Sequence, residues 1–155
     1  MLSPEDERWL RRAMDLARHS RASGQHPFGA LVVDAAGRVL GEGVNAFESD
    51  VTGHAEVNAV RAAHKQDAKA LQGATLYSSA EPCAMCAGAI YWSGIARVVY
   101  ALSEARLLDL TGAHPGNPTL SLPCREVFAR GQRSVEVIGP LLEDEAARAH
   151  EGFWR

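Results

Sequence analysis

Residues 74–102, ATLYSSAEPCAMCAGAIYWSGIARVVYAL, decide the fold class of this chain, because they predict a strand, a helix and a second strand in succession. The two strands are expected at Ala74–Ser79 and Arg97–Leu102. Between them, Pro82 suits the first position of a helix, and Ser93-Gly94 would end that helix. Alternation of this kind predicts an α/β protein in which helices cover a sheet.

The alternation continues on both sides of this segment. Upstream, the expected elements are a helix that begins at Ser3-Pro4, strands at residues 29–33 and 38–40 joined by a turn, and a helix at about residues 54–64. Downstream, they are a loop at residues 107–122, a short helix at 125–130, a strand at 135–138 and a terminal helix from Pro140. We therefore expect a single domain, residues 1–155, with one sheet between helices on both faces.

Composition limits the partners that the chain can take. Apolar residues make up 46% and charged residues 23%, and no apolar run approaches the ~20 residues that cross a bilayer. Three cysteines, an odd number, argue against a disulfide framework, and the acidic start is unlike a signal peptide, so a cytoplasmic location is expected. A formal net charge of −3 favours a small-molecule partner over nucleic acid, and the arginines of the first helix are interpreted as its solvated face.

Two short motifs, His-Ala-Glu at residues 54–56 and Pro-Cys-Ala-Met-Cys at residues 82–86, suggest a metal site. Cys83 and Cys86 share one face of a helix, near its positive end, where the thiolate form that binds metal is favoured. With His54 they give three protein ligands. A structural zinc ion normally has four, whereas a catalytic one leaves a position open, so we predict one catalytic Zn²⁺ per subunit.

Glu56 is the acid placed to move protons at this site. On a regular helix, His54 and Glu56 would lie on nearly opposite faces, so they can share a site only if His54 occupies the irregular start of the helix. Zinc would supply hydroxide near neutral pH, and Glu56 would carry protons to the ring and to the departing ammonia. Each motif is weak alone, but the full H-x-E…P-C-x-x-C pattern is typical of zinc-dependent base deaminases.

Four motifs extend this pattern: HPFGA (26–30), GEGVN (41–45), HAEVNAVR (54–61) and EPCAMCAGAIYW (81–92). In these motifs the chain resembles the cytidine deaminase-like superfamily, specifically its guanine deaminase and tRNA adenosine deaminase branch. The resemblance implies a three-layer α/β/α sandwich around a five-stranded mixed sheet. It also implies a homodimer in which the C-terminal segment is exchanged between subunits.

Within that branch, the residues around Phe28 and Trp92 are more similar to guanine deaminases than to tRNA-editing enzymes, so guanine is the first substrate hypothesis. Phe28 and Trp92 could stack on a flat ring, and Asn45 could hydrogen-bond its edge. Alternatively, the two aromatics belong to the core and Asn45 to a turn. In this branch a polar residue usually stands where this chain has Ala80.

A guanine site should also present an acid to the base, and Glu104 and Asp109 are equal candidates, with exposed helix charges as the alternative. Phe153 and Trp154 could close the site or pack as core. The full set of expected substrate contacts is Phe28, Asn45, Ala55, Trp92, Glu104, Asp109, Phe153 and Trp154.

Other functions stay open at this point. The same chemistry could act on an adenosine in tRNA, on cytosine, on a nucleoside or on an aminotriazine. A non-catalytic zinc-stabilised scaffold would need a fourth protein ligand, for which Cys124 is the candidate, although its surroundings suggest a small buried side chain. A thiol–disulfide oxidoreductase is the remaining alternative for the paired cysteines.

Overall fold

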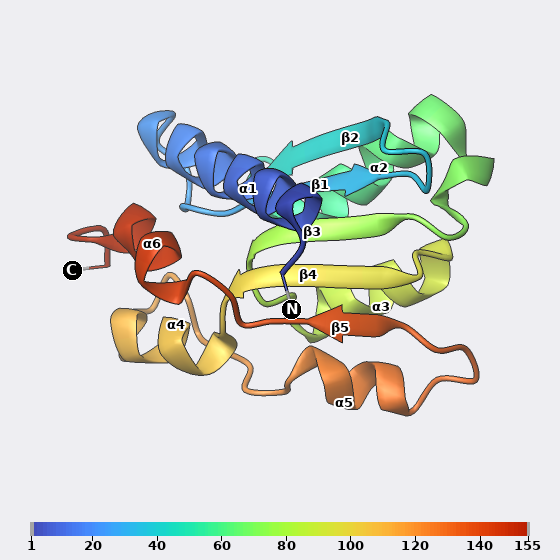
Figure 1. Cartoon of the computed structure of the whole chain (residues 1–155). Helices are drawn as coiled ribbons and strands as arrows, with labels where there is room; N and C mark the ends of the chain where they lie inside the picture. Colours follow the sequence, from blue (N-terminus) through green and yellow to red (C-terminus); the bar gives the residue numbers. More distant parts are fainter. Residues whose placement is uncertain (1, 155) are drawn as a thin grey trace.

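A computed structural model describes residues 2–154 and contains a five-stranded mixed sheet between two layers of helices (Figure 1). The strands are β1 (Gly29–Val33), β2 (Val39–Val44), β3 (Thr75–Ala80), β4 (Arg97–Leu102) and β5 (Glu136–Ile138). They lie in the order β2-β1-β3-β4-β5, in which β1 is antiparallel to both neighbours and β3, β4 and β5 are parallel. The α/β/α sandwich predicted for this chain is confirmed.

Helices cover both faces of this sheet. They are α1 (Pro4–Ala22), α2 (Ala55–Asp67), α3 (Ala84–Ser93), α4 (Glu104–Thr111), α5 (Cys124–Ala129) and α6 (Glu143–Ala147), with 3-10 turns η1 (Lys69–Leu71) and η2 (Arg148–His150). One apolar cluster joins the sheet to α1 and α6, and the other joins it to α2, α3 and α5. None of the helices described for residues 2–154 is both long and apolar enough to cross a membrane.

Strand β1 shows how one short segment contributes to both layers. Ala30 and Val32 belong to the cluster beneath α2 and α3, whereas Leu31 and Val33 belong to the cluster beneath α1. Successive side chains of a strand point to opposite faces, so a strand covered on both faces carries an unbroken apolar run. This explains why residues 29–33 are buried throughout.

Two glycines of β2 let α2 lie unusually close to the sheet. A Cβ atom on Gly43 would stand 2.2 Å from the carbonyl oxygen of Ala55, and one on Gly41 would stand 2.6 Å from the nitrogen of Ala63. Neither contact is possible for a residue with a side chain. Gly43 therefore fixes the position of the first turn of α2.

Several element boundaries differ from the sequence-based expectation, and three of these differences concern α3, α4 and α6. Helix α3 begins at Ala84 rather than at Pro82, because Cys83 has extended dihedral angles and forms the N-cap. The expected loop starts only after α4, which Ser103 caps by accepting a hydrogen bond from the Arg106 N–H and which Gly112 ends. The terminal helix α6 begins at Glu143, not at Pro140.

Candidate zinc and substrate site

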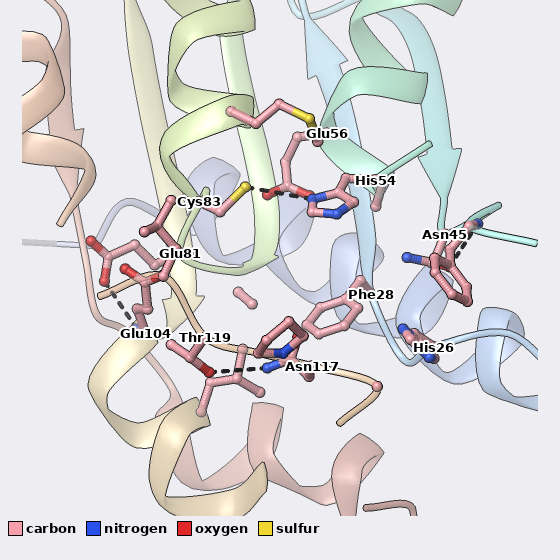
Figure 2. Close-up of a pocket in the computed structure, with 18 of the residues that line it drawn as sticks. His26, Phe28, Asn45, His54, Glu56, Glu81, Cys83, Glu104, Asn117 and Thr119 are labelled. Carbon is pink, nitrogen blue, oxygen red and sulfur yellow. Dashed lines mark hydrogen bonds between the residues drawn. The ribbon is translucent and has the colours of Figure 1, made fainter. Parts of the chain in front are cut away.

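A cavity of about 370 Å³ lies at the edge of the sheet where β3 and β4 end (Figure 2). Its residues come from separate segments that this edge brings together: the entry to β1, the exit of β2, the start of α2, the β3–α3 junction and the chain after β4. In parallel parts of a sheet the carboxyl ends of strands share one edge, and loops there commonly carry function. The two deaminase-like motifs thus meet in one place.

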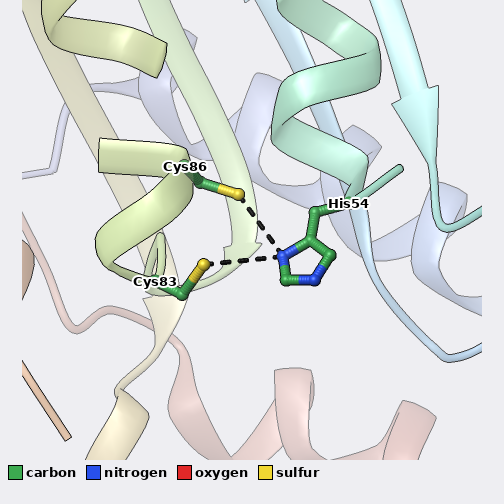
Figure 3. A group of neighbouring side chains, drawn as sticks. All are labelled: His54, Cys83 and Cys86. Carbon is green, nitrogen blue, oxygen red and sulfur yellow. Dashed lines mark hydrogen bonds between the residues drawn. The ribbon is translucent and has the colours of Figure 1, made fainter. Parts of the chain in front are cut away.

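The predicted metal ligands converge from two helix starts (Figure 3). His54 is the N-cap of α2, with extended dihedral angles, as its separation from Glu56 requires. Cys83 is the N-cap of α3, and Cys86 lies in the first turn of that helix. Both helices therefore present their positive ends to the thiolates.

The spacing of these three side chains fits zinc. Nδ1 of His54 lies 3.5 Å from Sγ of Cys83 and 3.5 Å from Sγ of Cys86. A tetrahedral Zn²⁺ with bonds of about 2.1 Å to nitrogen and about 2.3 Å to sulfur separates the two atoms by about 3.6 Å. Hydrogen bonds from Cys86 and His54 lower the pKa of Cys83 to about 4, which favours the thiolate.

Cys124 does not join this group. Among the residues that the structure describes, the ligand atoms of His54, Cys83 and Cys86 form the metal-binding cluster without a fourth His, Cys, Asp or Glu. Cys124 is buried at the start of α5, where its N–H donates to the carboxylate of Glu81. The three-ligand arrangement of a catalytic zinc site is therefore the one present.

Glu56 lies beside the metal ligands on the first turn of α2 (Figure 2). The residue is buried, and this burial, followed by the nearby charge of Cys83, raises the pKa of its carboxyl group to about 7. A carboxyl group in this setting can both accept and donate a proton near neutral pH.

Asn45 and Phe28 line the same cavity. Asn45 follows β2 and is only 4% exposed, and its Oδ1 accepts the N–H of Phe47 at 3.1 Å. It thus forms the turn that was one alternative, while its side-chain NH₂ group is left to donate into the cavity. Phe28 precedes β1 and presents its half-buried ring to the cavity (Figure 2). Ala55 also lines the cavity, at the first position of α2.

The two acidic candidates on α4 differ in position. Glu104, the first residue of the helix, is 9% exposed and lines the cavity, whereas Asp109 is exposed and lies outside it. Five residues along a helix correspond to about 140° around its axis, which turns Asp109 away from the site. Burial, together with the nearby charges of Glu81 and Cys83, raises the pKa of Glu104 to about 7.

Trp92 does not stand opposite Phe28 in this chain. It lies near the end of α3, 86% exposed and outside the cavity. Helix α3 starts at the metal site, and the rise of eight positions from Ala84 to Trp92 carries the tryptophan about 12 Å along the axis. The expected stacking of a base between Phe28 and Trp92 is therefore not formed within one chain.

The C-terminal aromatics pack at the rim of the cavity. The Trp154 ring lies 5.1 Å from that of His26, 5.3 Å from that of His114 and 6.3 Å from that of Phe28, measured between centroids. Its Nε1–H donates to Nδ1 of His150 at 3.0 Å. Trp154 thus contacts residues that line the cavity without lining it itself, and Phe153 packs against the Trp154 ring.

Several cavity residues were not foreseen from the sequence. The segment Gly116–Leu120, in the loop between α4 and α5, forms one wall, and within it the Asn117 side chain donates to Oγ1 of Thr119 at 3.1 Å. Glu81, His26 and Phe47 also line the cavity. The glycines and prolines of the loop signalled irregular structure but not its position over the site.

Comparison with known proteins agrees with this geometry. Residues 3–102 match the model of the cytidine and deoxycytidylate deaminase zinc-binding region. The chain belongs to the cytidine and deoxycytidylate deaminase family. Its His/Cys/Cys site is the zinc site typical of that family, and the protein is a zinc-dependent deaminase.

Relatives of this deaminase act on different bases. The chain is 42% identical over 154 residues to a probable cytosine deaminase of Schizosaccharomyces pombe, which covers 99% of this chain and 94% of the relative. It is 44% identical over 99 residues to a guanine deaminase of Bacillus subtilis, and this match covers 61% of this chain and 63% of that protein. The structure of a guanine deaminase from Nitrosomonas europaea superposes with a TM-score of 0.76 at 25% identity, covering 97% of this chain and 84% of that one.

Other relatives widen the range of ligands. Proteins of the same fold bind nucleobase ligands, among them 8-azaguanine and 2,6-diaminopurine. tRNA-specific adenosine deaminases are relatives as well. The cytosine, guanine and tRNA adenosine deaminases among these relatives thus differ, by their names, in the base that they deaminate.

Proposed function

We propose that this protein hydrolyses the exocyclic amine of a free nucleobase, with guanine as the first candidate. The observation that carries the proposal is the cavity lined together by two of the zinc ligands, His54 and Cys83, by Glu56, by an aromatic ring and by two polar side chains. His54, Cys83 and Cys86 would hold the zinc ion, which would activate a water molecule for attack near neutral pH.

The cavity side chains suit a flat ring with polar edges. Phe28 offers its ring for stacking, the NH₂ group of Asn45 donates to a ring carbonyl or ring nitrogen, and the Glu104 carboxyl accepts ring N–H groups. Asn45 and Glu104 lie on opposite sides of the cavity (Figure 2). Guanine has both an acceptor edge and an N–H edge, so it can satisfy both side chains at once.

Glu56 performs the proton transfers in this proposal. It accepts the proton of the attacking water and delivers it to the ring nitrogen next to the reacting carbon. It then takes the proton of the new hydroxyl group on that carbon and gives it to the amino group, which leaves as ammonia. Its burial keeps this proton out of exchange with bulk solvent during the reaction.

Cytosine is the second candidate, and a specific observation favours it. The probable cytosine deaminase of Schizosaccharomyces pombe aligns along 94% of its own length, whereas the match to the Bacillus subtilis guanine deaminase covers 63% of that protein. Cytosine also carries a carbonyl group beside a ring N–H, so the same donor and acceptor can bind it.

The charge distribution supports a free base over tRNA. Three arginines on the exposed face of α1 form ion pairs: Arg11 with Glu145, Arg12 with Glu42 and Arg18 with Asp15. Phosphate contacts require unpaired basic groups, and the formal net charge is −3. Binding of tRNA that weakens steeply with salt would argue for the RNA substrate instead.

We also propose that the protein acts as a homodimer. The exposed ring of Trp92, a large aromatic side chain at the end of α3, supports this because aromatic residues are enriched at protein interfaces. Sedimentation of the wild-type chain and of Trp92→Ala tests it: a dimer that the substitution weakens is expected, and a wild-type monomer at micromolar concentration argues against it.

The substrate is tested by ammonia release from guanine, guanosine, adenine, cytosine, their nucleosides and aminotriazines, with zinc-depleted protein as the control. We expect turnover of guanine or cytosine that is lost on zinc removal and restored by added zinc. Turnover of nucleosides alone would contradict the free-base proposal. Absence of ammonia from every compound with zinc-loaded protein would contradict the deamination of these bases.

A further inference from the structure

Glu81 connects two helices that border the cavity. Its Oε1 accepts the N–H of Glu104 at 3.0 Å, and its Oε2 accepts the N–H of Cys124 at 3.0 Å (Figure 2 shows the first of these bonds). Glu104 is the first residue of α4, and Cys124 is the first residue of α5. One carboxylate therefore holds the starts of both helices.

The loop of residues 112–123 lies between these two helices. It has no helix or strand of its own, and its residues Gly116–Leu120 form a wall of the cavity. Its internal hydrogen bonds are local, such as the one from Asn117 to Thr119. The distance of this wall from the zinc ligands is therefore set largely by the elements on either side of the loop.

Glu81 is itself fixed to the sheet. Its N–H donates to the carbonyl oxygen of Leu102 at 2.7 Å, which ties it to the last residue of β4, and Cys83 follows two residues later. The N–H groups at a helix start lack partners within the helix, and a carboxylate satisfies them with strong, charge-assisted bonds. Both oxygens of Glu81 are used in this way.

We propose that Glu81 is a positioning residue for substrate binding. It sets the distance between the zinc ligands and the 112–123 loop, and it orients Glu104, which lies on the same side of the cavity (Figure 2). The inference rests on the proposed function in one respect, namely that the cavity binds a base. The hydrogen-bonding arrangement itself is independent of the substrate.

Two substitutions of Glu81 remove one or both of its hydrogen bonds to the helix starts, so their effects on KM can be compared. Glu81→Gln keeps one acceptor oxygen and so one of the two bonds, whereas Glu81→Ala removes both. We expect KM for the preferred base to rise at least 10-fold in Glu81→Ala and by an intermediate factor in Glu81→Gln. The kcat should change less than KM in both variants, and each should retain one zinc ion per chain.

Glu143→Ala is the matched control. The Glu143 carboxylate also accepts an N–H at the start of α4, that of Ser103 at 2.9 Å, but Glu143 does not line the cavity and does not bond to α5. If stabilising α4 were the whole role of Glu81, both alanine variants would raise KM equally. That result would overturn the proposal.

Hydrogen–deuterium exchange gives a readout that does not depend on turnover. We expect the amides of Glu104 and Cys124 and the peptides of the 112–123 loop to exchange faster in Glu81→Ala, with intermediate rates in Glu81→Gln, while β3 stays protected. Unchanged loop exchange, or an unchanged KM despite faster exchange, would overturn the proposal. If the wild type deaminated no base, the proposed function would fail, but hydrogen–deuterium exchange would still test whether Glu81 holds the starts of α4 and α5 and the 112–123 loop between them.

Discussion

At the scale of single residues, the site depends on two side chains that precede their helices. His54 and Cys83 are both N-caps with extended dihedral angles, and this allows their side chains to meet between α2 and α3. The separation of His54 from Glu56 by two positions predicted the first cap. Nothing in the spacing of Cys83 and Cys86 predicted the second, because a pair three residues apart also fits the interior of a helix.

Glu104 is expected to recognise the base. Glu104→Gln removes the ionised form of the side chain, which accepts ring N–H groups, so KM for the preferred base, measured above pH 7 where Glu104 is ionised, should rise about 10-fold or more. Asp109→Asn, on the exposed part of the same helix, should leave KM unchanged. Steady-state ammonia release measures both, and equal effects of the two substitutions would contradict the assignment of Glu104.

At the scale of elements, a partly buried ion pair between Asp6 and Arg97 ties α1 to the sheet. The Asp6 carboxylate accepts hydrogen bonds from Arg97 of β4 at 2.8 Å and from the Tyr77 hydroxyl of β3 at 2.7 Å. The Arg97 bonds lower the pKa of Asp6 from 3.8 to about 2, so folding is stabilised above the unfolded pKa near 4. This contribution, about 2 kcal/mol, is lost as pH falls through 4 towards 2.

Asp6→Asn should therefore lower the free energy of unfolding at pH 7 by about 2 kcal/mol or more, since the substitution also leaves Arg97 partly unpaired. The difference from wild type should shrink below pH 4. Urea unfolding at pH 7 and at pH 3 measures it. A difference that stays constant with pH would mean that the charge of Asp6 contributes nothing.

The close approach of α2 to β2 gives a second test at this scale. Gly43→Ala would push the first turn of α2 away from the sheet, so loss of zinc affinity and of several kcal/mol of stability is expected. Gly88→Ala is the matched control. Gly88 lies inside α3, and a methyl group added there would meet open space. This variant should gain up to about 1 kcal/mol. Zinc titration measures the zinc affinity of both variants, and thermal unfolding measures their stability. Wild-type zinc affinity and stability in Gly43→Ala would contradict the role of Gly43 in placing α2.

The C-terminal segment borders the cavity through Trp154. A chain that ends at Gly152 lacks Phe153 and Trp154 and so loses the contacts with His26 and Phe28 at the rim. Turnover of the best base at low substrate concentration should fall about 10-fold, because the rim loses an apolar cover. If kcat/KM of this chain equals that of the wild type, the C-terminal aromatics do not close the site.

At the scale of the whole molecule, the sequence predicted the sandwich and the metal ligands because both depend on local signals. Strand and helix periodicities gave the order of layers, and ligand spacing gave the zinc site. The choice between Glu104 and Asp109, the exposure of Trp92 and the cavity wall at residues 116–120 depend on how distant segments pack. A single sequence holds no periodic signal for such contacts, so these features became visible only in the folded chain.

The Glu56→Gln variant shows whether Glu56 acts together with a zinc ion held by three protein ligands. The measurement is ammonia release from the preferred base together with zinc content, on wild-type and variant protein purified in parallel. We expect one zinc ion per chain in both proteins and turnover at least 100-fold lower in the variant, the usual contribution of a general acid–base group. A zinc-loaded Glu56→Gln protein that releases ammonia at the wild-type rate would contradict this role of Glu56.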